Sequence, residues 1–276
     1  MNTSLSTFAK GGVHPRESKG LTEHLAIESM PLPDQVEIPL IQHFGAPCRA
    51  LVNKKDLVQE GDLIGQVNGG LGANIHASIT GKVTNIGSSP NPISLHVPSI
   101  TIDRDPEAPD KTYMPLDWTS LSRQELLQKV KDAGIVGIGG AGFPTHVKLA
   151  PPPDAKVDTL ILNGAECEPY LTTDHRLMLE RPEEIIEGMK ILLHILGIKQ
   201  GYIGIEANKG DAIEILNKTV GNQKLNGLKI HINPLKVKYP QGSEKQLIES
   251  ITNRKVPGFG LPFGLRRNSV KMPINF

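Results

Sequence analysis

The sequence predicts a mixed α/β protein with two domains, a β-rich domain followed by an α/β domain. Residues 36–103 carry short runs of alternating apolar residues separated by glycine turns, which is the pattern of half-buried strands. Residues 119–262 alternate between apolar, strand-like segments and amphipathic helical segments, as an α/β domain does. A chain of 276 residues is long enough to give each domain its own core.

The composition excludes several classes of function. Basic and acidic residues nearly balance at 30 and 29, and aromatic residues make up only 4%, so we expect no nucleic-acid binding. Cys48 and Cys167 are the two cysteines, too few for the four thiolates of an iron–sulfur cluster or a structural zinc site. The longest apolar run, residues 189–198, is too short to cross a bilayer. We therefore expect no metal site and no direct membrane span.

The first hundred residues predict an arm and a small β domain. Residues 1–35 are polar and interrupted by glycine and proline, which indicates an extended arm. Within residues 36–103, the segments 58–66 and 76–83 resemble the two halves of a biotinyl/lipoyl-like β half-barrel. Carrier domains of that type hold a modified lysine at a hairpin tip, but the tip at residues 68–72 has no lysine. The half-barrel is therefore interpreted as a scaffold.

Helix signals mark the start of the second domain. Residues 104–118 are rich in proline and acids and predict a linker. Ser122 and Glu125 have the spacing of a capping box, and Gly134 is a helix stop, so we expect a helix between them. The remaining signals predict strands at 157–162, 202–207 and 228–232 and helices at 182–196, 211–220 and 244–253.

A glycine-rich stretch, residues 137–145, follows the first helix of this domain. Its four glycines within six residues leave backbone N–H groups bare for a phosphate or a flat ring, and Phe143 and Lys148 follow closely. The G-x-G-x-x-G match does not come directly after a strand, so an ordinary dinucleotide fingerprint is a poor fit. A glycine loop of another type, binding a nucleotide or flavin, and a plain turn without a ligand both stay open.

An acidic segment, residues 163–170, follows the strand at 157–162. Ligands gather at such strand ends in open α/β sheets, and Asn163, Glu166 and Glu168 could hold ribose hydroxyls or the edge of a flavin. A solvated acidic loop is the alternative. The two glutamates flank Cys167 and should raise the pKa of its thiol, so we expect no nucleophilic cysteine and no other catalytic residue.

Three separated motifs together resemble a known family. The stretches 137–149, 160–178 and 239–247, with the glycine-rich arm at residues 11–15, are similar to the RnfC subunit of the Rnf ion-translocating electron-transport complex. The resemblance extends to about Pro262. Because that family is similar in its core to the flavoprotein subunit of respiratory NADH dehydrogenase, it implies a Rossmann-like α/β domain that binds FMN. Electrons would pass from NADH through FMN toward iron–sulfur clusters.

The resemblance also implies roles for individual residues. The loop glycines would line the FMN phosphate and ring, Phe143 and Glu168 would contact NADH, and the others would surround the isoalloxazine ring and ribityl chain. Ala165 departs from the pattern, since the dehydrogenase subunit has an aspartate there. The implied cofactor-binding residues are Gly137, Gly139, Gly140, Gly142, Phe143, Lys148, Asn163, Glu166, Glu168, Gly242 and Glu244.

Partners and location follow from the same resemblance. It implies integral membrane subunits and other subunits that translocate the ion, with this subunit peripheral on the cytoplasmic side of the bacterial inner membrane. The [4Fe–4S] clusters of the full-length family need cysteines that this chain lacks. Because the apolar pattern breaks after Pro262, residues 263–276 are interpreted as an atypical, truncated tail, with a frameshift as the hypothesis. A stand-alone flavin-dependent NADH oxidoreductase and a non-catalytic scaffold remnant remain the alternatives.

Overall fold

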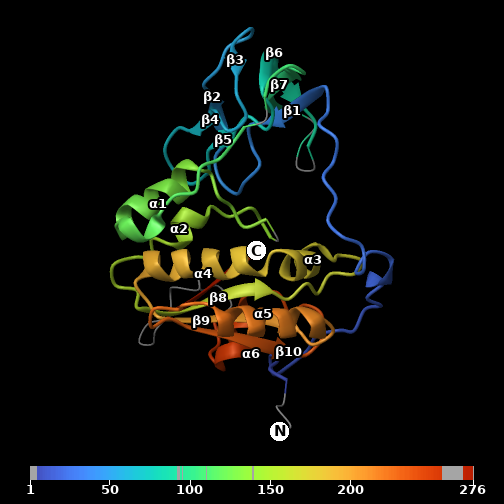
Figure 1. Ribbon diagram of the computed structural model, residues 1–276, viewed down its shortest axis with the longest axis vertical. Coiled ribbons are helices and arrows are strands. Elements are labelled where there is room, and N and C mark those ends of the chain that lie inside the picture. The colour runs from blue at the N-terminus through green and yellow to red at the C-terminus, as the bar shows by residue number, and fades with distance from the viewer. Residues whose placement is uncertain are drawn as a thin grey trace. The chain divides into compact units, whose positions relative to one another are not determined.

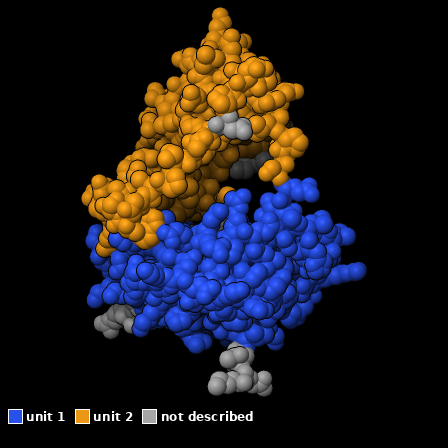
Figure 2. Space-filling model, in the orientation of Figure 1, with its two compact units in different colours: residues 1–28, 148–276 blue, residues 29–147 orange. Residues whose placement is uncertain are grey.

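The computed structural model describes residues 5–91, 94, 96–109, 111–138, 140–256 and the backbone of 270–275. Two compact units make up the chain (Figure 2). The β unit comprises Ser29–Val147, and the α/β unit comprises Met1–Glu28 with Lys148–Phe276. The N-terminal arm therefore packs with the α/β unit. The first helix and the glycine loop, which the sequence pattern assigned to the α/β domain, share a unit with the β strands.

The β unit contains two small antiparallel sheets. The larger has the strand order β1-β7-β6-β3, and the smaller has the order β2-β4-β5. This arrangement confirms the predicted half-barrel. Gly61 lies in the turn between β3 and β4, and Gly81 is the first residue of β6. The strands are β1 (Gln35–Pro39), β2 (Cys48–Ala50), β3 (Leu57–Val58), β4 (Leu63–Val67), β5 (Ile75–His76), β6 (Gly81–Ser89) and β7 (Val97–Arg104).

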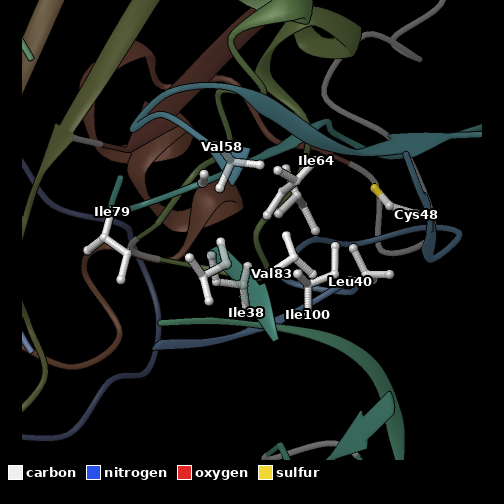
Figure 3. Packing of buried hydrophobic residues seen from close by; sticks show 11 residues of the cluster. Ile38, Leu40, Cys48, Val58, Ile64, Ile79, Val83 and Ile100 are labelled. Atoms are coloured by element: carbon white, nitrogen blue, oxygen red, sulfur yellow. The ribbon is translucent and has the colours of Figure 1, made fainter. Parts of the chain in front are cut away.

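Side chains from both sheets form the core of the β unit. In Figure 3, Ile38 of β1 and Val83 of β6 point toward Ile64 of β4 across the space between the sheets. Ile64, Val83 and Ile100 are fully buried, which fits the alternation of apolar residues in these segments. Gly81 permits β6 to approach β7, because a Cβ there would lie 2.0 Å from the carbonyl oxygen of Asp103.

Helix α1 (Arg123–Asp132) has the predicted capping box. The backbone N–H of Glu125 donates to Ser122 Oγ at 3.3 Å, and the N–H of Ser122 donates to Glu125 Oε2 at 2.8 Å. The chain turns at Gly134, whose φ is +66°. A Cβ at that position would lie 2.2 Å from the carbonyl oxygen of Asn74, so the turn after the helix requires glycine for two reasons.

The α/β unit is built on a parallel sheet with the order β10-β9-β8-β11. Helix α4 covers one face and α6 the other, as Figure 1 shows. A Cβ on Gly201 of β9 would meet Met189 of α4, whereas one on Gly204 would meet Leu247 of α6. The elements are α2 (Thr145–Lys148, across both units), β8 (Val157–Gly164), α3 (Thr173–Glu180), α4 (Pro182–Leu196), β9 (Gln200–Glu206), α5 (Gly210–Asn222), β10 (Lys229–Leu235), α6 (Glu244–Thr252) and β11 (Val270–Asn275).

Three details of this unit differ from the sequence predictions. Strand β11 pairs with β8, so residues 270–275 belong to the sheet and not to a tail outside the domain. The predicted loss of pattern at 263–269 lies outside the described residues. Helix α3 was not predicted. Helix α6 forms as predicted, but Ser243, whose spacing to Gln246 predicts a capped start, makes no capping hydrogen bond with its side chain.

The N-terminal segment up to Glu28 is held along the α/β unit. Ser6 pairs with Leu235 at the end of β10, and Val13 pairs with Tyr239. Phe8 of the arm is 4% exposed. A polar sequence therefore supplies an integral part of this unit. In the part of the chain that the structure describes, no helix has the length and apolarity needed to cross a membrane.

Candidate functional site

Polar groups collect at the carboxyl edge of the parallel sheet. Strand β8 ends at Gly164, β9 at Glu206 and β10 at Leu235, so the segments that follow all leave from the same edge. Ligands of open α/β sheets bind at this edge. Six residues of the predicted site belong to this unit: Lys148, Asn163, Glu166, Glu168, Gly242 and Glu244.

Asn163 and Gly242 are brought together although they are far apart in the sequence. The Asn163 Nδ2 donates to the carbonyl oxygen of Gly242 at 2.9 Å, while its Oδ1 accepts from the N–H of Ala165 at 3.2 Å. A Cβ on Gly242 would lie 2.4 Å from the Ala165 carbonyl oxygen and 3.5 Å from Cys167 Sγ. Gly242 is therefore required for this close approach of two backbone segments.

Lys148 and Glu244 form an ion pair in the same unit. The Lys148 Nζ lies 3.2 Å from Glu244 Oε1, and the side chains are 23% and 37% exposed. Glu244 stands in the first turn of α6, where the helix dipole favours a negative charge. Because both side chains remain partly accessible, a cation and a carboxylate are available to a ligand at this position.

The two glutamates of the acidic segment have different surroundings. Glu166 is 6% exposed, and its Oε1 accepts from the N–H of Asp174 at 2.9 Å at the start of α3. Its Oε2 has no hydrogen-bond partner, and Glu166 is one of the residues that line a cavity of about 50 Å³. The charge of Glu168 and a hydrogen bond from Tyr239 to it raise the pKa of the Tyr239 phenol. The acidic segment is thus partly buried, and is not simply a solvated loop.

Cys167 lies at the centre of this segment as a thiol. Burial raises its pKa most, and the charges of Glu206 and Glu168 raise it further, against a hydrogen bond from Gly242 that lowers it. The direction agrees with the sequence prediction, but burial contributes more than the neighbouring acids that the sequence pointed to. Among the described residues, no group of three or more His, Cys, Asp or Glu side chains could hold a metal ion.

The glycine loop belongs to the β unit and is closed by its own backbone. The N–H of Gly137 donates to the carbonyl oxygen of Phe143 at 3.0 Å, and Gly142 donates back to Gly137 at 3.2 Å. Gly142 has a φ of +63°. The loop follows helix α1 and not a strand, which agrees with the argument against a dinucleotide fingerprint. Gly139 lies outside the described residues.

Residues 42–45 contact this loop, and the sequence pattern did not predict the contact. The N–H of Phe44 donates to Gly142 O at 2.9 Å, and the Phe44 ring stacks on Phe143 with centroids 5.8 Å apart. Phe44 is 53% exposed, so an aromatic face is accessible beside the loop. A cavity of about 1070 Å³ is bordered by Gly140, Ala141 and Gly142 together with residues of the segments 39–45 and 73–76.

Several charged side chains of the α/β unit are buried, which no sequence pattern predicts. Lys209 and Glu206 each have 1% of their side chain exposed, and Lys209 Nζ lies 3.7 Å from Glu206 Oε2. Lys19 of the arm is 6% exposed. Charged residues are normally read as surface residues, and only a fold that pairs them makes their burial possible.

Asp174 provides a pH-dependence prediction. Burial, with the nearby charge of Glu166, raises the pKa of its carboxyl from 3.8 to about 6. Because the folded protein binds this proton more tightly than the unfolded chain does, the protonated carboxyl adds to the free energy of unfolding. This contribution is complete below the unfolded-state pKa of 3.8 and is lost as the pH rises through about 6. We expect the free energy of unfolding of wild type to fall by about 2 kcal/mol between pH 4 and 6 relative to Asp174→Asn. Urea unfolding of both proteins at pH 4, 5, 6 and 7 measures this, and parallel pH profiles would contradict it.

Both parts of the chain match families of known proteins. Residues 130–270, half of the chain, match the family described as Nuo51 FMN-binding domain. Residues 7–107 match the RnfC barrel sandwich hybrid domain. The first match contains all the predicted site residues, and the second contains the β half-barrel with most of the arm.

Whole-chain relatives are similar to the sequence over most of its length. The chain is 47% identical over 255 residues to the C subunit of a proton-translocating ferredoxin:NAD(+) oxidoreductase complex of Clostridium ljungdahlii, covering 92% of this chain and 55% of that protein. It is 44% identical over 264 residues to the C subunit of a Na(+)-translocating ferredoxin:NAD(+) oxidoreductase complex of Acetobacterium woodii, covering 95% and 58%. The chain thus spans little more than half the length of these curated relatives.

Proposed function

Since this chain belongs to the RnfC family of ion-translocating oxidoreductase subunits, we propose that its α/β unit binds FMN and receives electrons from NADH. The chain would then be the electron-input part of such a complex. The observation that carries the proposal is the approach of Gly242 to Ala165 and Asn163 at the carboxyl edge of the sheet. These residues come from separate motifs and lie within the match to the Nuo51 FMN-binding domain.

The residues at this edge fit a flavin nucleotide chemically. Lys148 supplies an ammonium for an anionic or carbonyl oxygen, Asn163 a carboxamide, and Gly242 a backbone without a side chain. When bound, FMN would supply the redox chemistry, accepting two electrons from NADH and releasing them singly. The protein's part is to bind and orient the rings, so the protonated Cys167 thiol needs no catalytic role.

Each residue of this edge would have a positioning task. Asn163 is held at both ends of its carboxamide, so its orientation is set before a ligand arrives. The Glu244 carboxylate holds the Lys148 ammonium in place while leaving it partly accessible. Such pre-organisation reduces the entropy that ligand binding would otherwise lose.

The other predicted contacts are carried by the family resemblance. We propose that Gly137, Gly139, Gly140 and Gly142 contact FMN and that Phe143 contacts NADH. The closed shape of the glycine loop and the accessible aromatic face next to it support this role. For Glu168 we propose a contact with NADH, and for Glu166 a role at the ribityl chain through the backbone of its segment.

Partner subunits complete the proposed pathway. The names of the relatives place them in ion-translocating complexes. We propose that electrons leave FMN toward [4Fe–4S] clusters and that integral membrane subunits translocate the ion. This chain would be peripheral, on the cytoplasmic side of the inner membrane.

An absorption spectrum with added FMN, followed by anaerobic NADH, tests the proposal. We expect a flavin band that stays with the protein through gel filtration and bleaches with NADH. Lys148→Met should weaken FMN binding by about tenfold, since it removes a charged hydrogen-bond donor. Lys190→Met is the matched control, because Lys190 pairs with Glu187 on α4 at 3.0 Å. A wild-type chain without a flavin band would favour the scaffold alternative, and equal affinity in the Lys148 variant would remove Lys148 from the site.

A further inference from the structure

Lys19 of the N-terminal arm makes an unusual set of contacts. It opens a short turn, Lys19–Leu21, and is 6% exposed although it carries a charge. Its Nζ lies 3.0 Å from the carbonyl oxygen of Glu166, 2.9 Å from that of Glu168 and 2.6 Å from that of Leu171. An ammonium has three protons, and these three acceptors can take all of them. All three belong to one segment, which we name the 165–172 loop.

The 165–172 loop connects β8 to α3 and forms neither strand nor helix of its own. The arm holds it at further points. The N–H of Tyr170 donates to Glu17 O at 2.9 Å, and the Thr22 and Thr172 hydroxyls lie 2.8 Å apart. Tyr170 itself has a φ of +67°, a conformation that a residue with a side chain holds only when its surroundings impose it. The shape of the loop therefore depends on the arm.

The surroundings of Lys19 act on its charge in both directions, and the net effect lowers the pKa of its ammonium. Burial lowers the pKa of its ammonium most, and the charge of Lys209 lowers it further. The carboxylates of Glu166, Glu206 and Glu17 act in the opposite direction and favour the charged form. Removing the ammonium would leave the carbonyl oxygens of Glu166, in a buried bond, and of Glu168 and Leu171, in partly buried ones, without this donor. It would also leave the three carboxylates with less compensation.

The loop connects Lys19 to the proposed flavin site through adjacent peptide groups. The carbonyl oxygen of Ala165 faces Gly242, and the next carbonyl oxygen, that of Glu166, accepts from Lys19. Moving the Glu166 peptide would therefore move Ala165 against Gly242 and Asn163, because neighbouring peptide planes share a Cα.

We propose that Lys19 is a positioning residue, which holds the 165–172 loop in the shape that the flavin site requires. The inference rests on the proposed function. Lys19 need not touch FMN or NADH, since it acts through the backbone of the loop.

The test measures loop protection and flavin affinity in Lys19→Met. Hydrogen exchange of the loop amides in the ligand-free chain should become at least tenfold faster, and the Kd for FMN should rise by about tenfold. Lys238→Met is the control. Lys238 is 9% exposed, and its ammonium donates to Phe8 O at 2.8 Å and Gly11 O at 3.4 Å, both in the arm and not in the loop. Lys238→Met should leave the hydrogen exchange of the 165–172 loop and the Kd for FMN unchanged.

A milder variant keeps the test decisive if Lys19→Met does not fold. Lys19→Gln retains an N–H donor pair without the charge, so it should give faster loop exchange and an affinity for FMN between those of wild type and Lys19→Met. Unchanged exchange, or faster exchange with unchanged FMN affinity, would overturn the inference. A wild-type chain that binds no FMN would overturn the proposed function instead, and the exchange experiment would still decide whether Lys19 holds the loop.

Discussion

Replacing Gly242 by alanine is expected to abolish retention of FMN and to lower the free energy of unfolding of the α/β unit by about 1–3 kcal/mol. The added Cβ would lie 2.4 Å from the Ala165 carbonyl oxygen, a backbone atom that cannot rotate away. One of the two segments must move, and the hydrogen bond from Asn163 to Gly242 O moves with it. Flavin fluorescence titration and urea unfolding measure the two effects.

Gly188 offers the matched control for this substitution. It lies inside α4, and a Cβ there would meet no atom within 4 Å. Gly188→Ala should raise the free energy of unfolding by about 0.5–1 kcal/mol, since alanine loses less backbone entropy in a helix. FMN affinity should not change. If Gly242→Ala bound FMN as tightly as Gly188→Ala does, the contact between Gly242 and the 165–172 loop would not belong to the flavin site.

Lys209→Met is expected to lower the free energy of unfolding by about 3–5 kcal/mol at pH 8, the cost of leaving one partner of a buried pair without the other. Lys209 and Glu206 are almost completely buried, with Nζ and Oε2 3.7 Å apart. Burial already raises the pKa of Glu206, and the charge of Lys209 opposes that rise. The variant should therefore raise this pKa further. Because Glu206 is neutral below its folded-state pKa, the deficit should be smaller at pH 5 and grow toward pH 8.

A double variant separates charge from packing in this prediction. Glu206→Gln combined with Lys209→Met removes both charges and should recover part of the stability at pH 8. Urea unfolding at pH 5 and pH 8 of the wild type, the single variant and the double variant provides the measurement. An equal loss at both pH values would show that Lys209 contributes packing alone.

Local signals were sufficient for most helices and strands. Ser122 with Glu125 begins α1, and Gly197 ends α4 in the left-handed conformation, with a φ of +66°. Such signals act within one or two turns of the chain, so sequence spacing alone reveals them. Strand β11 shows where they fail. Val270, Met272 and Ile274 alternate along it, but Pro273 in its middle argues locally against a sheet strand, and the segment becomes a strand by pairing with β8.

The sequence by itself determined the fold class, the motifs of the RnfC family and the segments from which a site could be built. Only the tertiary structure decided how these segments meet. It placed Gly242 against Ala165, paired Lys209 with Glu206 inside the protein and brought Lys19 onto the 165–172 loop. The physical reason is that spacing reports hydrogen bonds between neighbours along the chain. Whether a charge can be buried depends on partners that approach from distant parts of it.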